Sequence, residues 1–434
     1  MARNQENEIS EKEPEAAGLP ESKAFRRNVR RHVEAPTHRF AAITAPEMAG
    51  LCQEELRSLG FSGTEITEAG VEFSGDFSYL YLANLWLRTA GRVLCRLPSF
   101  RAGIAEELFY KASGHHWELW LNPGIPLQVT AHVEHSRIEN EGVVADTVLT
   151  AVRKRFKARG LAPPAKWEPE SGGEMDKDEE EQASDEGETS PAVLSHKQRM
   201  IVHLRKNHCE ISLDTTGAHL HLRGYRLHHT GAPLRETLAA AILMKSGWRG
   251  DSPLVDGMCG SGTIPIEAAL MARRLPLGLR RPFLFQHWPA FGEKTWLYHC
   301  RKARESALDH SPVPIFALDH DPGAIQVAHD NAGRAGVEGD IHQECKDFFD
   351  FRPQDYGLAP GLLILNPPYG KRLGGGGKEL YERLGAHLHA SFGKWRVAIL
   401  APNRAMAMSL KIGSMRLWTV GHGGTPVLVV MGRL

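Results

Sequence analysis

The sequence predicts an α/β protein in which a Rossmann-like, doubly wound parallel sheet follows two smaller α+β modules. From Pro233 onward, helical and strand patterns alternate, as in a parallel sheet covered by helices on both faces. The strand pattern at 253–256 runs into a glycine-rich turn, and the apolar run at 362–365 ends in Asn-Pro-Pro-Tyr. Because ligands bind outside the carboxyl ends of such strands, we expect both segments to line one site.

Length and composition are those of a soluble globular protein of two or three domains, with 434 residues, 42% hydrophobic and 24% charged. No apolar run of about 18 residues predicts a membrane span, and the polar N-terminus predicts no secretory signal. Six scattered cysteines without a CxxC pair argue against disulfides or structural zinc and for a cytoplasmic protein. His219 and His221 have no third ligand nearby in sequence, so we expect no metal.

The first 38 residues are charged and poor in large apolar side chains, so we expect a disordered, mobile tail at 1–38. Its arginine cluster either contacts phosphate or is simply solvated. The cluster consists of Arg26, Arg27, Arg30 and Arg31. Residues 39–98 then show a β-α-β-α-β pattern, which predicts a ferredoxin-like module.

A second α/β module is predicted at 99–226. It contains a helix at 105–112, a strand at 126–133 and a helix at 142–159. The last helix ends in Arg and Lys residues, which either complement the helix dipole or grip phosphate. An acidic insert, 168–198, is expected to be disordered, because strands resume after it. These strands are expected at 200–204, 209–214 and 219–223, in one antiparallel group.

The formal net charge of zero hides an asymmetry. Residues 168–188 hold eleven acidic residues and one lysine, a net charge of −10, so the rest of the chain carries +10. A basic body is what an RNA or DNA partner requires, although a solvated basic surface would look the same. Nothing in the sequence predicts a stable oligomer, and we expect a monomer or a weak dimer.

The glycine-rich turn indicates the type of cofactor. It lies between a strand that ends in Asp256 and a helix from Ile264 to Ala272, so a ligand can meet the backbone and the helix N-terminus. The dinucleotide fingerprint is not met, because Ile266 occupies the place of the third glycine, and there is no P-loop lysine. A carboxylate repels a pyrophosphate but attracts the cationic end of an amino acid. This points to S-adenosylmethionine.

Later strands end in further polar residues. Asp319 could accept hydrogen bonds from both ribose hydroxyls; it could instead cap the next helix, but Asp321 fits that cap better. Near Asp347 and Phe348 an adenine amino group and ring face could be bound. The candidate cofactor-binding residues are Asp256, Gly257, Cys259, Gly260, Gly262, Thr263, Asp319, His320, Asp347 and Phe348.

The turn from Asn366 to Tyr369 provides the candidate catalytic residues Asn366, Pro367, Pro368 and Tyr369. Two prolines fix φ, remove two backbone donors and stiffen the corner. The amide and the free carbonyls can accept both hydrogens of an exocyclic NH2 group, while the tyrosine ring stacks on the flat molecule that carries it. The alternative is an ordinary Pro-Pro turn with an exposed tyrosine.

These motifs resemble those of a known family, the THUMP-domain RNA guanine-N2 methyltransferases, above all the first methyltransferase half of the RlmL-type large-subunit rRNA enzymes. The resemblance covers roughly residues 39–434. It rests on three groups of motifs: the cofactor motif 256–269, the catalytic motif 366–373, and hinge motifs at 214–217, 223–226 and 232–238. Two departures are Gly257, where the family usually has proline, and the chain end at Leu434, from which we expect no second methyltransferase activity.

The resemblance implies that residues 99–226 are a THUMP RNA-binding domain and residues 227–434 a class I methyltransferase domain. It also implies methylation of the N2 amine of a guanine in structured RNA, most simply 23S rRNA, with S-adenosylmethionine as donor and Asn366 as base-binding residue. Alternatives stay open: a tRNA guanine-N2 methyltransferase, a non-catalytic RNA-binding assembly factor, and a DNA adenine methylase, because the same turn binds any planar NH2 group.

Overall fold

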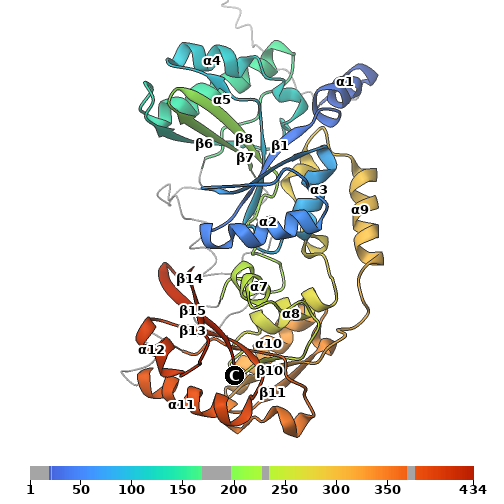
Figure 1. Ribbon diagram of the computed structural model, residues 1–434. Coiled ribbons are helices and arrows are strands. Elements are labelled where there is room, and N and C mark those ends of the chain that lie inside the picture. The colour runs from blue at the N-terminus through green and yellow to red at the C-terminus, as the bar shows by residue number, and fades with distance from the viewer. Residues whose placement is uncertain (1–18, 21, 169–196, 227–233, 369–376) are drawn as a thin grey trace, which may run out of the picture.

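The computed structural model describes residues 19–20, 22–168, 197–226, 234–368 and 377–434. Each half of the molecule is built around its own β-sheet, and the two halves are stacked end to end (Figure 1). The acidic insert that we expected at 168–198 lies outside the described residues, apart from positions 168, 197 and 198, and so does the catalytic-turn residue Tyr369. Among the described residues, no helix has the length and apolarity needed to cross a membrane.

The N-terminal half contains a sheet whose described strands follow the order β2-β3-β1-β4-β8-β7-β6, with β5 paired to β8. The strands are β1 (His38–Ile43), β2 (Glu65–Thr67), β3 (Gly70–Gly75), β4 (Arg92–Arg96), β5 (Phe100–Arg101), β6 (Leu127–Glu134), β7 (Gln198–Arg205) and β8 (His208–Asp214). Only β6 and β7 pair in parallel among these strands. Because β4 pairs with β8, one continuous sheet joins the two modules expected at 39–98 and 99–226.

Helices from the segment between residues 49 and 158 pack on this sheet. They are α2 (Ala49–Ser58), α3 (Phe77–Trp86), α4 (Ala105–Ser113) and α5 (Glu141–Ala158). Asp76 caps α3 by accepting from the Ser78 amide, and Asn140 caps α5 by accepting from the Val143 amide. The helices and strands expected between 39 and 159 are present, and β2 and β5 are additional strands that were not expected.

The N-terminal segment is not a mobile tail throughout. Residues Lys23–Val29 form helix α1, which Ser22 caps, and Arg30–Glu34 continue as a π-helical turn, η1. Val29 and Val33 are buried in the core of the N-terminal half, and the Val33 carbonyl lies 2.5 Å from His38 Nε2. The expectation of disorder is therefore wrong for this segment, because a few apolar side chains among the arginines are enough to dock it.

The third strand expected at 219–223 is also absent: this segment is a turn in the linker between the halves. The Leu220 amide donates to the Gly91 carbonyl, and the Arg281 guanidinium donates to the carbonyls of His219 and Leu222. An arginine far along the chain thus donates hydrogen bonds to carbonyls that would otherwise have bonded to a neighbouring strand. The His219 and His221 rings stack 5.4 Å apart, and no group of three metal-ligating side chains is found in the described part of the chain.

The C-terminal half is the expected doubly wound sheet, with described strands in the order β11-β10-β9-β12-β13-β15-β14. The strands are β9 (Leu254–Asp256), β10 (Ile315–Asp319), β11 (Ile341–Cys345), β12 (Leu362–Leu365), β13 (Arg396–Ala401), β14 (Arg416–His422) and β15 (Thr425–Arg433). The pairs from β11 to β13 are parallel, whereas β15 is antiparallel to both its neighbours. Strand order reverses at β9, which has β10 on one side and β12 on the other, so the ligand crevice is expected there.

Helices cover both faces of this sheet (Figure 1). They are α7 (Glu236–Lys245), α8 (Thr263–Ala272), α10 (Pro322–Ala335), α11 (Gly377–Ser391) and α12 (Arg404–Ser409), whereas α9 (Glu293–Glu305) packs on α3 of the N-terminal half. Short 3-10 turns are η2 (Pro46–Met48), η3 (Trp117–Leu119), η5 (Leu277–Arg280), η6 (Leu284–His287), η7 (Glu338–Asp340), η8 (Phe348–Asp350) and η9 (Pro353–Tyr356). Asp321 caps α10 by accepting from the Gly323 amide, as the sequence predicted.

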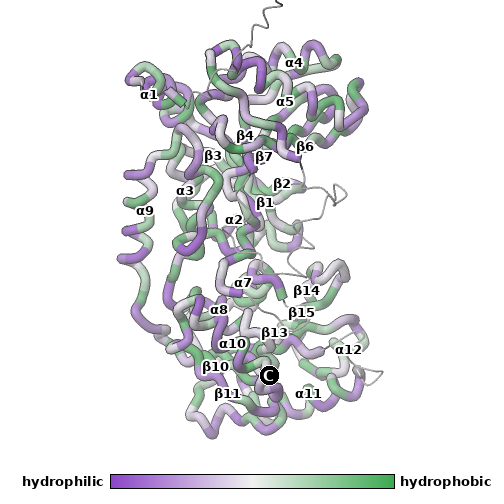
Figure 2. The backbone as a smooth tube through the Cα atoms, turned by 180° about the vertical axis from the view of Figure 1, so that it is seen from behind, coloured by the Kyte–Doolittle hydropathy of each residue, from purple (hydrophilic) through white to green (hydrophobic). Residues whose placement is uncertain are grey.

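After α8 the chain returns to the N-terminal half before the next strand of its own sheet. Phe283, Phe285 and Trp296 are buried in the core of the N-terminal half. The Tyr81 hydroxyl accepts a hydrogen bond from the Gly292 amide at 2.8 Å, at the start of α9. Helix α9 therefore lies on the outside of the N-terminal half, beside α3, with hydrophilic and hydrophobic residues alternating as on an amphipathic helix (Figure 2).

Candidate active site

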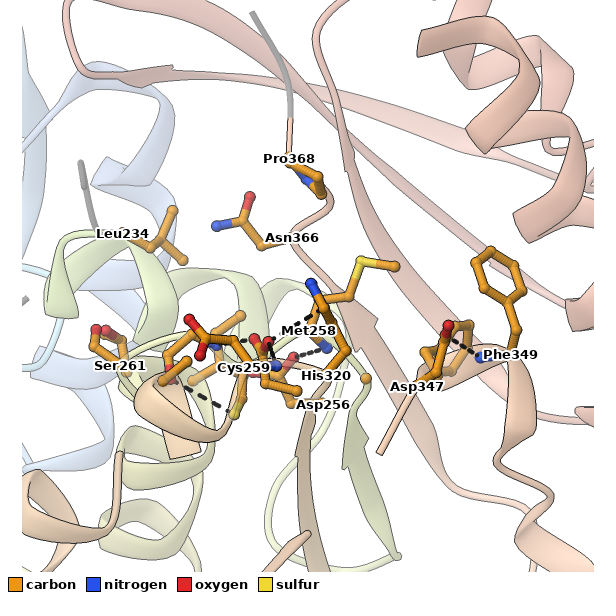
Figure 3. Close-up of a pocket in the computed structure, with 18 of the residues that line it drawn as sticks. Leu234, Asp256, Met258, Cys259, Ser261, His320, Asp347, Phe349, Asn366 and Pro368 are labelled. Atoms are coloured by element: carbon orange, nitrogen blue, oxygen red, sulfur yellow. Dashed lines mark hydrogen bonds and ion pairs between the residues drawn. The ribbon is translucent and has the colours of Figure 1, made fainter. Parts of the chain in front are cut away.

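A pocket of about 630 Å³ opens at the carboxyl ends of the central strands of the C-terminal sheet. In Figure 3 the side chains of Asn366 and Pro368 stand over the loop that carries Asp256 and Met258. Eleven of the fourteen residues predicted for the site line this pocket: Asp256, Gly257, Cys259, Gly260, Thr263, Asp319, His320, Asp347, Phe348, Asn366 and Pro368. Strands far apart in the sequence thus bring the two predicted motifs together.

Asp256 is a buried acid at the floor of the pocket, at the end of β9. Its Oδ1 accepts from the Met258 amide at 3.2 Å, while Oδ2 is buried without a hydrogen-bond partner among the described residues. Burial raises the pKa of this carboxyl to about 8; the Met258 amide opposes the shift and the charge of Asp319 adds to it. A cation placed at Oδ2 would supply the missing partner and favour the carboxylate.

Asp319, at the end of β10, holds the glycine-rich loop in place. Its Oδ2 accepts from the Gly260 amide at 2.9 Å, and its Oδ1 accepts from the Asp321 amide at 3.0 Å. The Cys259 amide donates to the Leu318 carbonyl at 2.9 Å, which ties the same loop to the same strand. Each Asp319 oxygen keeps a lone pair for a ligand, so the structure allows both a structural and a binding function for this carboxylate.

A different local requirement explains each glycine of the loop. A Cβ on Gly257 would come within 2.3 Å of the Phe348 ring, so glycine is required for this ring to form the pocket wall. Gly260 adopts φ +51° and its missing Cβ would meet nothing within 4 Å, so its free side faces open space beside the pocket. Gly262 does not line the pocket; it caps α8 at φ +83° and lets the helix approach Ala328 of α10.

The outer wall is the corner after β12. Asn366 is half-buried, and its Oδ1 is buried without a hydrogen-bond partner among the described residues. Pro368 is exposed and lines the pocket, whereas Pro367 is buried and contributes no lining. An amide oxygen that is withdrawn from water and left unpaired is costly for folding, so this atom is poised to accept from a ligand.

Sequence reasoning missed several lining residues. These are Leu234, Met258, Ser261, Ile264, Asp321, Ala324, Phe349 and Leu380. Met258, Ser261 and Ile264 lie inside the predicted motif and could have been included on position alone. Leu234 and Leu380 carry no local signal, because only the packing of α7 and α11 against the sheet brings them to the pocket. Phe349 is partly covered by the Arg383 guanidinium, 4.2 Å from its ring centre.

The linker between the halves supports the pocket from behind. Arg226 Nη2 donates to Thr263 Oγ1 at 2.6 Å and to the Leu234 carbonyl at 2.9 Å, and both partners line the pocket. The same guanidinium pairs with Glu236 at 3.4 Å. One turn further along α8, Glu267 accepts from the Tyr225 hydroxyl at 3.1 Å. The first turns of α8 are thus held by residues outside the C-terminal sheet.

The sequence matches two family models: an RMKL-like methyltransferase domain over residues 223–424 and an RlmL ferredoxin-like domain over residues 39–94. A Synechocystis protein assigned as an RNA methyltransferase is 31% identical over 94% of this chain and 98% of its own length. The Bacillus subtilis protein YpsC, assigned to the same class, is 33% identical over 83% of this chain and 87% of its own length. The chain belongs to the RlmL-like family of RNA methyltransferases.

Other members of the RlmL-like family are longer. The Methylococcus capsulatus ribosomal RNA large subunit methyltransferase K/L is 35% identical over 89% of this chain, yet the match covers only 50% of that protein. The chain therefore spans about half the length of its K/L relatives. The ferredoxin-like module predicted from the sequence is confirmed by the second family model.

Solved structures identify the cofactor of this RlmL-like chain. SMU.472, assigned as a methyltransferase and crystallised with S-adenosylhomocysteine, matches with a TM-score of 0.75 and 28% identity over 91% of this chain and 98% of its own. A Listeria monocytogenes protein, whose name assigns it adenine-N6 DNA methylation, matches with a TM-score of 0.75 and 27% identity over 91% of this chain and 96% of its own. The predicted fold class is confirmed, and S-adenosylmethionine is the cofactor.

Proposed function

We propose that this protein methylates the N2 amine of a guanine in large-subunit ribosomal RNA, 23S rRNA in bacteria. The observation that carries the proposal is Asn366 Oδ1, which is buried without a partner among the described residues at the wall of the pocket that also contains Asp256. The names of the K/L relatives support ribosomal RNA as the substrate class. Six free cysteines fit the reducing cytoplasm, where ribosomes are made.

The site residues fit an adenosyl amino-acid cofactor. Asp256 Oδ2 has no partner in the described part of the chain and would take the cationic amino end, Asp319 would accept from the ribose hydroxyls, and the Phe348 ring would lie against the adenine. The cofactor supplies an electrophilic methyl group on a sulfonium. Figure 3 places Asp347 and Phe349 at the opposite end of the pocket from Leu234 and Ser261, which gives the site the length that an extended ligand needs.

Asn366 would orient the nucleophile. The guanine amine donates one hydrogen to Asn366 Oδ1 and the other to the Pro367 carbonyl, so that the nitrogen lone pair points toward the methyl group. The gain comes from positioning, and no strong general base is required because the methylated amine loses its proton readily to solvent. The base leaves its stack to enter such a pocket; Tyr369, which would stack on it, stays a prediction from the sequence.

One experiment tests the proposal. The full chain is incubated with labelled S-adenosylmethionine and separate pools of unmodified rRNA and tRNA, and the methylated nucleoside is identified by mass spectrometry. N2-methylguanosine in large-subunit rRNA supports the proposal, whereas the same nucleoside in tRNA alone overturns the substrate assignment.

Two other outcomes would overturn a larger part of the proposed function. N6-methyladenine in a parallel reaction with duplex DNA would reject guanine and RNA together, and would agree with the name of the Listeria neighbour. Failure to bind S-adenosylmethionine in calorimetry would reject catalysis and leave an RNA-binding assembly factor.

A further inference from the structure

Helix α1 and its continuation η1 display a stripe of four exposed arginines. The apolar residues Phe25, Val29 and Val33, spaced four apart, pack on the core of the N-terminal half. In a helix the residues that follow them by one position lie on a flank, and those that follow by two positions lie on the opposite face. These residues are Arg26, Arg27, Arg30 and Arg31, and all four are exposed.

These arginines have no ion-pair partner among the described residues, unlike Arg96 and Arg155 of the same half. Arg96 pairs with Glu72 and Glu210, and Arg155 pairs with Glu118 at 2.8 Å. The arginines of the stripe also repel one another. Two pairs, Arg26/Arg30 and Arg27/Arg31, have the i,i+4 spacing at which like charges destabilise a helix by about 0.2–0.5 kcal/mol each. Arg26 and Arg27 lie in the last turn of α1, where the helix dipole favours cations, but the dipole does not require four arginines together, whereas an anionic partner would.

The stripe adjoins a second group of cations at the end of α5. The His32 ring of η1 packs on His116, with ring centres 4.8 Å apart, and His116 Nδ1 lies 2.5 Å from Arg155 Nη2. Around this junction α5 ends with the exposed side chains of Arg153, Lys157 and Arg159. Arg159 shares Glu118 with Arg155, at 3.4 Å, yet its side chain stays 51% exposed. Two helices thus present positive charge on neighbouring parts of one surface.

We propose that the arginine stripe of α1 and η1 is a phosphate-binding surface that holds the RNA substrate far from the methylated base. The inference rests on the proposed RNA substrate. Four guanidinium groups on a docked helix match the spacing-tolerant, sequence-independent recognition of a nucleic acid backbone. A lipid surface fits less well, because the apolar face of the helix is packed on the protein and cannot insert into a bilayer.

The test replaces the four arginines together: R26Q, R27Q, R30Q and R31Q in the full chain. Binding of a 23S rRNA transcript is measured from low to high salt. Each lost phosphate contact removes about 0.7–0.9 from the slope of log Kd against log salt, so we expect the slope to fall by about 3 and the low-salt Kd to rise at least about tenfold. In turnover, KM for the transcript rises while kcat and S-adenosylhomocysteine affinity stay at their wild-type values.

A control variant carries the same change in charge at the other end of the molecule: K394Q, K411Q, R416Q and R433Q, all exposed residues around the end of the C-terminal sheet. Removing the repelling arginines should not lower stability, which thermal unfolding checks. An unchanged salt slope in the stripe variant, an equal loss in the control, or binding of the stripe to phosphatidylserine vesicles instead of RNA would overturn the inference. Wild-type protein that neither binds nor methylates RNA would reject the proposed function itself.

Discussion

Helix α8 contacts two buried polar regions, one at its first residues and one along its side. The two regions differ in whether their buried polar groups have partners within the protein. At the side, Glu267 is fully buried; its Oε1 pairs with Arg223 at 3.4 Å and accepts from the Tyr225 hydroxyl, and only its Oε2 has no hydrogen-bond partner among the described residues. At the first residues, the pocket leaves Asp256 Oδ2 and Asn366 Oδ1 without partners among the described residues. In the first arrangement the buried charge is compensated, so that removing one partner is what costs stability. The second costs stability, and ligands would supply what it lacks.

The largest expected effect concerns the paired region. Glu267→Ala leaves Arg223 buried without its carboxylate, and loss of one partner of a buried pair costs about 3–5 kcal/mol in the free energy of unfolding. Urea unfolding of the full chain measures the loss. Glu267→Gln should cost less, since its remaining oxygen still accepts from the Tyr225 hydroxyl. An alanine variant within 1 kcal/mol of wild type would remove the distinction between the two regions.

In the pocket the expected loss is in catalysis. Asn366→Ala should reduce kcat by about 100- to 1,000-fold, the usual cost of removing one hydrogen-bonding group that positions the reacting atoms. The affinity for S-adenosylhomocysteine and the unfolding free energy should stay near wild type.

The matched control for this prediction is Asn403→Ala. Asn403 follows the neighbouring strand β13, but its Oδ1 caps α12 by accepting from the Met406 amide at 3.0 Å. Loss of this cap should cost about 1 kcal/mol of stability and leave kcat unchanged. Wild-type turnover in Asn366→Ala would show that the amide does not hold the base.

A pH series would sharpen the comparison at Asp256. Burial raises the pKa of this carboxyl to about 8, so it is mostly protonated near pH 6 and must lose its proton to bind a cationic group. The affinity for S-adenosylhomocysteine should therefore rise about tenfold per pH unit below pH 8 and level off above it. Calorimetry at several pH values measures this. Asp256→Asn should bind weakly at every pH, whereas Asp347→Asn, at an exposed acid of the same pocket, should keep the slope.

The smallest expected effect is on cofactor affinity, and it concerns Arg226 in the linker between the halves. Arg226→Met removes the hydrogen bonds to Thr263 and to the Leu234 carbonyl, and should weaken S-adenosylhomocysteine binding about tenfold, or about 1.4 kcal/mol. Arg273→Met is a close match: Arg273 bonds the Gly336 carbonyl and Asp340, is similarly buried, and caps the far end of the same helix. Its variant should lose stability but not affinity. Equal affinity losses would mean that α8 responds as a whole.

The parts that the sequence predicted well are those determined locally. The apolar run at 362–365 is β12 residue for residue, and Asp321 caps α10, because hydrophobic patterning and capping act within a few residues. The parts that it missed depend on distant contacts. The apolar residues of 23–34 are too few to stand out among arginines, and the 219–223 alternation is overridden by Arg281, about sixty positions further along. The raised pKa of Asp256 likewise depends on neighbours that no local pattern names.

The segment between α8 and β10 makes the stability of each half depend on the other. Phe283, Phe285 and Trp296 belong to the C-terminal segment by sequence, but they are buried in the core of the N-terminal half. Cutting the chain at the linker would expose this aromatic surface on one fragment and open a hole in the other. The two sheets therefore look like independent domains yet should not be separable, and exchange of either half between relatives would succeed only if these aromatic residues travelled with the core that receives them.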